Sequence, residues 1–375
     1  MTAATGTVVM PRRDARLVWV GVAIGLVILA LAALLLDVPY LGSFVDWLIN
    51  RVPPLSYLIV QYAVPIAFGA LCGVMCERSG VTNIGIEGMI LTSAFVAFLT
   101  GAYLHTVVGA PLAAIVGIGT AIVAAMLLST LHAWLSITIK ADQIISGTVI
   151  NILALGGTAF FNQLLVSTTR LSGTNTLPRL DVPNEVAAIP FIGPIIDALL
   201  NQGPIAMSLI VLVVFLQIML FRSRWGLRTR AVGEHPKAAD TVGIDVVRTR
   251  YRSVILGGVF AGLAGAYLTL EQFNSFQDNM TGGVGFIGLA AMIFGRWTPL
   301  GAYGAALLFG AVQSMQLAVR ISPPEGDLGG IISAIPPQVF GMLPYVFTII
   351  VLAGVVGRAV PPAADGIPYD KEARG

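Results

Sequence analysis

Residues 221–252, FRSRWGLRTRAVGEHPKAADTVGIDVVRTRYR, form a basic stretch between two apolar runs, and this stretch decides how the chain is arranged. Eight of the chain's 21 Lys and Arg residues lie in it, opposed only by Glu234, Asp240 and Asp245. Short loops rich in Lys and Arg remain on the cytoplasmic side of a membrane. The stretch therefore predicts a cytoplasmic loop, 222–252, between two membrane spans.

The middle of this loop, GEHPKAADTVGIDV, predicts a short helix of its own. Proline suits a first helical turn, two alanines follow it, and a glycine marks the end of the helix. A capped helix in a cytoplasmic loop is suited to binding a partner. The candidate contact residues are Gly233, Glu234, Pro236, Ala238, Ala239, Gly243 and Ile244.

The composition indicates an integral membrane protein built of helices. The chain has 375 residues, of which 56% are hydrophobic and 11% are charged. Apolar runs of about 20 residues, the length that spans a bilayer, recur along it. Alternating strands of about ten residues, which a membrane barrel would need, are absent. The net charge of +2 gives no indication of nucleic-acid binding.

Ten apolar segments are candidate membrane spans, and together they form one polytopic domain, 17–356. The first follows a tail, 1–16, and is too long for a cleaved signal sequence. The eighth is too short to cross alone, and its glycines indicate a half-helix or re-entrant piece lined by protein. The segments are roughly 17–36, 55–76, 83–103, 109–131, 143–166, 204–221, 253–271, 285–295, 299–319 and 338–356.

Parity and charge together predict the orientation. With ten spans, the N-terminal tail and the C-terminal tail, 357–375, lie on the same side. If that side is the cytoplasm, it carries 17 of the 21 Lys and Arg residues, as the positive-inside rule requires. The longest outer loop, 167–203, contains an amphipathic stretch, IPFIGPIIDALL, that suits a membrane surface. The outer basic residues are Arg51, Arg170, Arg179 and Arg320.

Polar side chains at membrane depth are costly unless they face a cavity or a partner. Asn83 and Glu87 lie four residues apart, and hence on one helical face. Gly80, Gly85 and Gly88 permit a helix break around them, a device that transporters use to build a site. We therefore expect Asn83 and Glu87 to line the translocation path. The alternative is that Glu87 only satisfies a packed neighbour.

Three other charged residues are given structural interpretations. Glu77 and Arg78 come at the cytoplasmic end of the second span, where an interfacial ion pair is the favoured interpretation. Glu271 begins a polar cluster at the outer end of the seventh span, for which a solvated loop is favoured.

Further polar and small residues recur on other spans. Gln143 and Asn151 share one stripe of the fifth span, and Gln313 lies on the ninth. For these three, a place in the path and hydrogen bonding between helices are equally compatible with the pattern. Gly283 and Gly285, at the start of the eighth span, suit a helix break or close packing.

Other chemistry is not indicated. His105, His132 and His235 are scattered singly, so no metal site is expected. The phosphate-binding pattern G-x-x-x-x-G-K-[ST] is absent, so the chain is not expected to hydrolyse ATP or to hold a cofactor. An intramembrane enzyme would need paired catalytic groups in facing spans, and the sequence offers none.

Three stretches resemble signatures of one known family. In order and spacing, from about residue 55 to 356, they resemble the permease family of bacterial ABC importers for branched-chain amino acids, ribose-type sugars and nucleosides. The form ERSG–NIGIEGM resembles the nucleoside and simple-sugar branch. The stretches are ERSGVTNIGIEGMILTSAF (77–95), AVGEHPKAADTVGIDVVRTRYRSVILGGVFAGLAGAY (231–267) and GGVGFIGLAAMIFGRWTPLGAYGAALLFG (282–310).

The resemblance implies a bacterial plasma-membrane protein that pairs with a second permease, identical or homologous. Two cytoplasmic ATPase domains would bind this core and hold the ATP, and a substrate-binding lipoprotein would deliver the solute. Transport would proceed by alternating access, with the helix in the basic loop as the coupling element. The alternative is an ion-coupled secondary transporter, which would need an acidic relay, and Glu87 alone gives that little support.

The predicted orientation can be tested with single cysteines at Arg230 and Asn184, in a chain from which Cys72 and Cys76 have been removed. An impermeant thiol reagent, applied to intact cells after any outer membrane is permeabilised, is expected to label position 184 and to leave position 230 unlabelled. The charge distribution is the physical reason. Labelling of position 230 but not of position 184 would refute the orientation.

Overall fold

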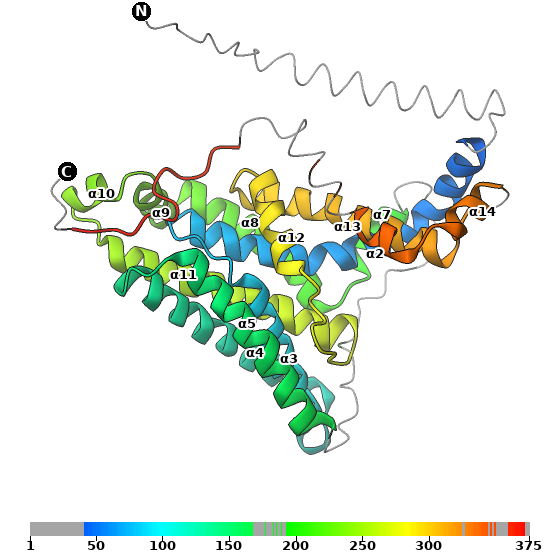
Figure 1. Ribbon diagram of the computed structural model, residues 1–375, viewed down its shortest axis with the longest axis horizontal. Coiled ribbons are helices and arrows are strands. Elements are labelled where there is room, and N and C mark those ends of the chain that lie inside the picture. The colour runs from blue at the N-terminus through cyan, green and yellow to red at the C-terminus, as the bar shows by residue number, and fades with distance from the viewer. Residues whose placement is uncertain are drawn as a thin grey trace, which may run out of the picture. The chain divides into compact units, whose positions relative to one another are not determined.

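The structure is a computed structural model that describes residues 41–167, 193–324, 327–343 and 359–371, together with positions 177, 183, 185, 189, 346 and 349. Every regular element within these ranges is a helix (Figure 1). The chain divides into two compact units, Met1–Pro53 with Gln316–Phe340, and Pro54–Met315 with Gly341–Gly375. The second unit contains all the predicted site residues.

Seven helical stretches in the described ranges are long and apolar enough to cross a membrane, so the chain is an all-helical membrane protein. They are Leu55–Glu77, Ile86–Val108, Ala110–Thr138, Gln143–Val166, Pro204–Arg222, Val246–Gln272 and Pro299–Ile321. These stretches belong to α2 (Leu41–Glu77), α3 (Ile86–Val108), α4 (Ala110–Ala133) with the π-helical turn η1 (Trp134–Thr138), α5 (Gln143–Phe161) with η2 (Asn162–Ser167), α8 (Pro204–Arg222), α11 (Val246–Tyr267) with η3 (Leu268–Gln272), and α13 (Pro299–Ile321).

These seven stretches match seven of the ten predicted spans. The predicted span 17–36 lies outside the described residues, and 338–356 lies mostly outside them. The remaining helices are short: α7 (Gly193–Leu200), α9 (Arg224–Glu234), α10 (Pro236–Thr241), α12 (Val284–Phe294), α14 (Asp327–Ala334) and α15 (Pro337–Gly341). In the first unit, the Trp47 indole N–H donates to the Ser322 carbonyl at 2.7 Å.

Helix α12 is a half-helix, as its glycine-rich sequence predicts. Its 11 residues rise only about 16 Å, which is too short to cross a bilayer. Its first turn packs at Gly69 of α2, and the turn that follows its end reaches Glu77, the last residue of α2. Eight residues, or about 12 Å of helix, separate these two points on α2. Helix α12 therefore begins inside the bundle and ends at one face of it.

The centre of the second unit is formed by α3, α4 and α11, which pack against one another in every pairing. Small residues on α11 allow this close approach. A Cβ added to Gly258 would lie 2.6 Å from Ser129 Oγ, and one added to Gly262 would lie 2.5 Å from Ile122 Cα. Both distances are below any real carbon contact, so these glycines set the spacing between the α11 and α4 backbones.

Contacts between loops place several connecting segments at one end of the second unit. The 78–85 connection contacts the 295–298 turn through Arg78 and Trp297, and Gly233 at the end of α9 binds Ala364. The segment that contains Ala364, 359–371, lies against α9 and α10 (Figure 1). The basic loop and part of the predicted C-terminal tail thus share one end. Which side of the membrane this end faces remains a prediction.

A glycine substitution tests the packing of α11 on α4. Gly262→Ala is expected to lower the thermal unfolding midpoint in detergent, because overpacking a tight helix contact costs about 1–3 kcal/mol. Gly119→Ala on α4 is the matched control, since a Cβ there meets no atom within 4 Å. That control is expected to be neutral or slightly stabilising, because alanine favours helix more than glycine does. Equal midpoints for the two variants would contradict the packing described here.

Candidate functional site

The break between α2 and α3, residues 78–85, is the first part of the site. Asn83 shapes it locally, because its Oδ1 accepts a hydrogen bond from Gly85 N at 3.0 Å. The Asn83 side chain is completely buried, and its amide nitrogen lies 3.6 Å from both Cys76 Sγ and Met89 Sδ. The structure therefore places Asn83 within the packed interior, holding the backbone of the loop.

Two predicted path residues of α5 hold the same loop from its other side. Gln143 Oε1 accepts from Thr82 N at 2.7 Å. Asn151 makes two bonds, accepting from Gly88 N at 2.8 Å and donating to Ile84 O at 3.0 Å. These contacts satisfy main-chain groups that the break in the helix leaves without partners. Hydrogen bonding between elements, which the sequence left open, is what the geometry shows for both side chains.

His132 of α4 completes this set of contacts, and the sequence analysis missed it. Its Nε2 lies 3.0 Å from Thr82 O, its Nδ1 lies 3.0 Å from Ser146 Oγ, and its side chain is fully buried. A signal was present in the sequence, because Ser129, His132 and Ser136 follow one another at helical spacing and all are buried. Because the histidines were considered only as possible metal ligands, this row of buried polar side chains was not predicted.

Glu87 binds the beginning of the half-helix α12. One carboxylate oxygen accepts from Gly283 N at 2.8 Å, and the other accepts from Gly285 N at 2.6 Å. The first N–H groups of a helix have no partners within it and carry partial positive charge, so a carboxylate there is strongly favoured. Gly285 permits the approach, since a Cβ on it would lie 2.6 Å from Glu87 N. Glu87 thus satisfies a packed neighbour, and its place in the translocation path stays a prediction.

Glu271 makes the same kind of contact elsewhere. Its two carboxylate oxygens accept from Ile205 N at 2.8 Å and from Ala206 N at 3.2 Å, at the start of α8. The side chain is only 4% exposed, so the expectation of a solvated side chain was wrong for Glu271, whereas Gln277 and Asp278 of the same cluster are exposed. Gly203 makes room for the carboxyl group, because a Cβ there would lie 2.5 Å from Glu271 Cγ. Two buried glutamates therefore each cap a helix to which they do not belong.

The five predicted path residues do not all come together. Asn83, Glu87, Gln143 and Asn151 surround the 78–85 loop and the start of α3. Gln313 lies on α13 just beyond Gly310, which packs at Ile59 of α2. Glu87 binds the start of α12, which packs at Gly69 of α2, and Ile59 is 10 residues from Gly69, or about 15 Å along the helix. Gln313 is therefore separated from the other four along the bundle.

The expected ion pair between Glu77 and Arg78 is not formed, because each side chain binds elsewhere. Glu77 Oε2 accepts from the Trp297 indole at 2.6 Å. Arg78 donates to the carbonyls of Trp297 at 2.7 Å and of Arg296 at 3.2 Å, and its guanidinium lies over the Phe221 ring. Both side chains tie the end of α2 to the turn after α12.

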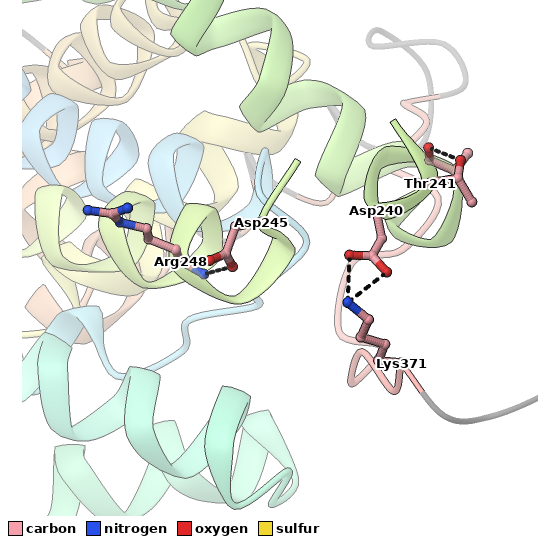
Figure 2. Close-up of polar contacts among 6 residues, drawn as sticks. Asp240, Thr241, Asp245, Arg248 and Lys371 are labelled. Carbon is pink, nitrogen blue, oxygen red and sulfur yellow. Dashed lines mark hydrogen bonds and ion pairs between the residues drawn. The ribbon is translucent and has the colours of Figure 1, made fainter. Parts of the chain in front are cut away.

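The predicted short helix of the basic loop is confirmed as α10, Pro236–Thr241. It ends before Gly243, whose φ of +82° favours glycine. Asp245 then starts α11 by accepting from Arg248 N at 2.8 Å, and the Arg248 guanidinium extends away from it (Figure 2). On this surface Val242 is 75% exposed, an unusual position for a valine outside the membrane spans.

Two of the seven predicted contact residues in this loop are buried: Gly233 packs against the Arg78 carbonyl, and Ala239 packs with Val232 and Val246. Glu234 is exposed and accepts from Ala363 N at 3.1 Å. Ala238 and Gly243 are exposed, whereas Pro236 and Ile244 are partly buried. Fewer residues of this loop are therefore exposed to a partner than the seven that the sequence motif predicts.

Arg250 is a further residue whose place the sequence did not reveal. It counted as one of the loop's basic residues, yet it is 1% exposed and donates to Ile367 O at 2.9 Å. Its position at helical spacing from Val246 and Val254, both buried, was the available signal. Nearby, burial raises the pKa of the Asp365 carboxyl to about 6, opposed by hydrogen bonds with Thr82 and Glu77 and by the charge of Arg250.

Comparison with known proteins identifies the chain as a transport permease. Residues 56–352 match the family described as branched-chain amino acid transport system / permease component. The chain belongs to this family. It is therefore a multi-pass plasma-membrane protein and a transporter component, not a catalytic enzyme, and family membership does not favour the ion-coupled alternative.

Three relatives share most of their length with the chain. The guanosine ABC transporter permease protein NupQ of Bacillus subtilis is 39% identical, over 84% of this chain and 95% of its own. The nucleoside ABC transporter permease protein NupC of Lactococcus lactis is 37% identical, over 83% and 94%. A putative glucose ABC transporter permease protein of Haloferax volcanii is 33% identical, over 81% and 94%.

Substitution of Glu87 tests its role at α12. Glu87→Leu leaves the buried N–H of Gly285 and the partly buried N–H of Gly283 without this acceptor, at a cost of about 1–3 kcal/mol for the buried group. Glu87→Leu is expected to lower the unfolding midpoint and nearly to abolish uptake. Glu87→Gln keeps one acceptor oxygen and is expected to lower the unfolding midpoint and the uptake rate only partially. Asp142→Asn removes a charge from an exposed helix N-terminus, where asparagine caps equally well, and serves as the control. Unchanged stability and uptake in Glu87→Leu would contradict this role.

Proposed function

We propose that the chain is a permease subunit of an ATP-driven ABC importer that carries nucleosides, with simple sugars as the second candidate class. The observation that carries this proposal is the similarity to NupQ and NupC, whose names specify guanosine and nucleosides, over more than four fifths of the chain. The Haloferax relative, named for glucose, supports the second class. In this proposal the complete chain has ten spans with both termini in the cytoplasm.

The chemistry of the core supports a neutral, hydroxyl-rich solute. A carboxylate that exchanges ions during transport must be free to bind them. Glu87 and Glu271 are instead each occupied by two helix N–H groups. A nucleoside or a sugar needs hydrogen-bonding groups and no counter-charge. We place the path beside the start of α12, because transporters use the ends of half-helices within the membrane to contact substrates.

Three partners complete the proposed importer. A cytoplasmic ATPase, which holds the ATP, binds the exposed face of α10, and its closure moves α9 and α10. A second permease, identical or homologous, forms the other half of the membrane core. A substrate-binding lipoprotein on the outer side delivers the solute, and the two conformations of the core expose the path alternately to each side.

The substrate class is tested by uptake in a strain that lacks this chain. Radiolabelled guanosine, uridine, ribose and glucose are supplied at equal concentrations, and each uptake rate is compared with that of the same strain carrying the gene. Restored uptake of the nucleosides alone is the expected result. Restored uptake of sugars alone would favour the second class, and uptake abolished by an ionophore but not by ATP depletion would overturn ATP-driven transport.

The docking surface is tested at Val242. Val242→Asp places a charge on an exposed apolar contact and is expected to prevent co-purification of the ATPase while the chain remains inserted in the membrane. Val107→Asp is the matched control, because Val107 is also 75% exposed and lies in the last turn of α3, outside α9, α10 and residues 359–371. Co-purification that survives Val242→Asp, or that is lost equally in the control, would contradict docking at α10.

A further inference from the structure

The segment 359–371, named here the C-terminal segment, contacts both the end of α9 and the break between α2 and α3. Its Ala364 N donates to Gly233 O at 2.9 Å, and its Ala363 N donates to the Glu234 carboxylate at 3.1 Å. Its Asp365 Oδ1 accepts from Thr82 Oγ1 at 3.1 Å. The segment is therefore hydrogen-bonded at once to the coupling region and to the loop that leads into α3.

Arg250 fixes the segment in place. From the first part of α11, its Nη1 donates to Ile367 O at 2.9 Å and its Nη2 lies 3.5 Å from Ala364 O. The guanidinium passes directly beside Gly80, where a Cβ would lie 2.8 Å from Nη2 and 3.0 Å from Ala364 O. Gly80 has a φ of +84°, so neither its backbone conformation nor the space around it suits another residue.

The same contacts explain how Arg250 can be buried. A guanidinium out of water is strongly unfavourable unless acceptors and a negative charge surround it. Both of its acceptor carbonyls belong to the C-terminal segment, and the nearby carboxylate is Asp365 of that segment. Without the segment, this guanidinium would lose both acceptor carbonyls and the nearby carboxylate. The segment is thus required for the packed arrangement around Gly80.

The far end of the segment contacts α10 directly. Lys371 lies 3.5 Å from the Asp240 carboxylate of α10 (Figure 2), and Asp370 lies 3.2 Å from Lys140 after η1. Tyr369 packs on the cluster that buries Ala239. These residues and the turn from α10 to α11 line one open hollow of about 740 Å³. The two ion pairs are exposed and therefore weak, so the C-terminal segment is held mainly by its buried contacts with Arg250.

We propose that the C-terminal segment is a mechanical link that transmits movement of α9 and α10 to the 78–85 loop, in addition to the direct contact of Gly233 with the Arg78 carbonyl, and that Arg250 is its positioning residue. The loop continues into α3, whose first turn carries Glu87 and so the start of α12. A displacement at α10 thereby reaches α12 through three consecutive polar contacts. These are the contact of α10 with Lys371, that of Asp365 with Thr82, and that of Glu87 with the start of α12. This inference rests on the proposed function, since it assumes that an ATPase moves α9 and α10.

The test uses the complete transporter in proteoliposomes, with its ATPase and binding protein. Three chains are compared with the intact one: a chain that ends at Arg358, Arg250→Lys, and the control Arg252→Ala, which changes an exposed arginine of the same helix. For each chain we would measure co-purification of the ATPase, basal ATP hydrolysis, hydrolysis stimulated by substrate-loaded binding protein, and guanosine uptake.

The truncated chain is expected to bind the ATPase and to hydrolyse ATP at the basal rate, with no stimulation and with uptake lowered about tenfold, a typical size for coupling between two sites. Arg250→Lys keeps the charge but cannot form the two-pronged contact, so an intermediate loss of stimulation is expected. This variant also keeps the test valid if truncation reduces membrane insertion. Arg252→Ala is expected to behave as the intact chain.

Normal stimulation and uptake in both the truncated chain and Arg250→Lys would overturn the link. Loss of ATPase co-purification in the truncated chain would also overturn it, because the segment would then be part of the docking surface. An intact chain that neither binds the ATPase nor transports guanosine would refute the proposed function itself. Failure of the link and failure of the function are therefore distinguishable.

Discussion

The structure depends on one constraint, that a helix beginning within a membrane must have partners for its first N–H groups. Helix α12 begins inside the bundle, where Glu87 accepts from the N–H groups of Gly283 and Gly285 and Thr281 O accepts from that of Val284. An unsatisfied N–H group within the hydrocarbon core of a bilayer would cost several kcal/mol. Because Glu87 lies in the first turn of α3, the start of α3 and the start of α12 are joined. The break between α2 and α3 is therefore held in position by its connection to α12 as well as by α4 and α5.

This arrangement places the 78–85 loop between the membrane core and the coupling helices. On the core side, Gln143, Asn151 and His132 bind its backbone, and on the other side α9 and the C-terminal segment contact it at Gly80 and Thr82. Because neighbouring elements contact this loop from both sides, a movement of one of them acts on it directly. Such an element suits alternating access, in which a change at the cytoplasmic end must reach the middle of the bundle.

The buried carboxyl groups show that residue type alone does not reveal which groups a side chain contacts. Glu87 was expected to line a path because an intramembrane charge is usually functional. Glu271 was expected to be solvated because it follows a span. Both side chains cap helices remote in sequence, at separations of 196 and 66 residues, and no local pattern reveals such a partner. Arg250 and His132 were undervalued for the same reason, because each binds main-chain carbonyls contributed by distant segments.

The sequence by itself determined the helical membrane class, seven of the spans, the half-helix at α12, the short helix α10 and the family. These properties follow from the length of apolar runs, from glycine and proline, and from motifs, all of which are local or additive along the chain. Only the tertiary structure decided which main-chain groups Glu87, Asn151 and Gly233 contact, and that Ala239 faces inward. Those outcomes depend on which helix ends meet in space, and that is fixed by the packing of small residues such as Gly262 between whole helices.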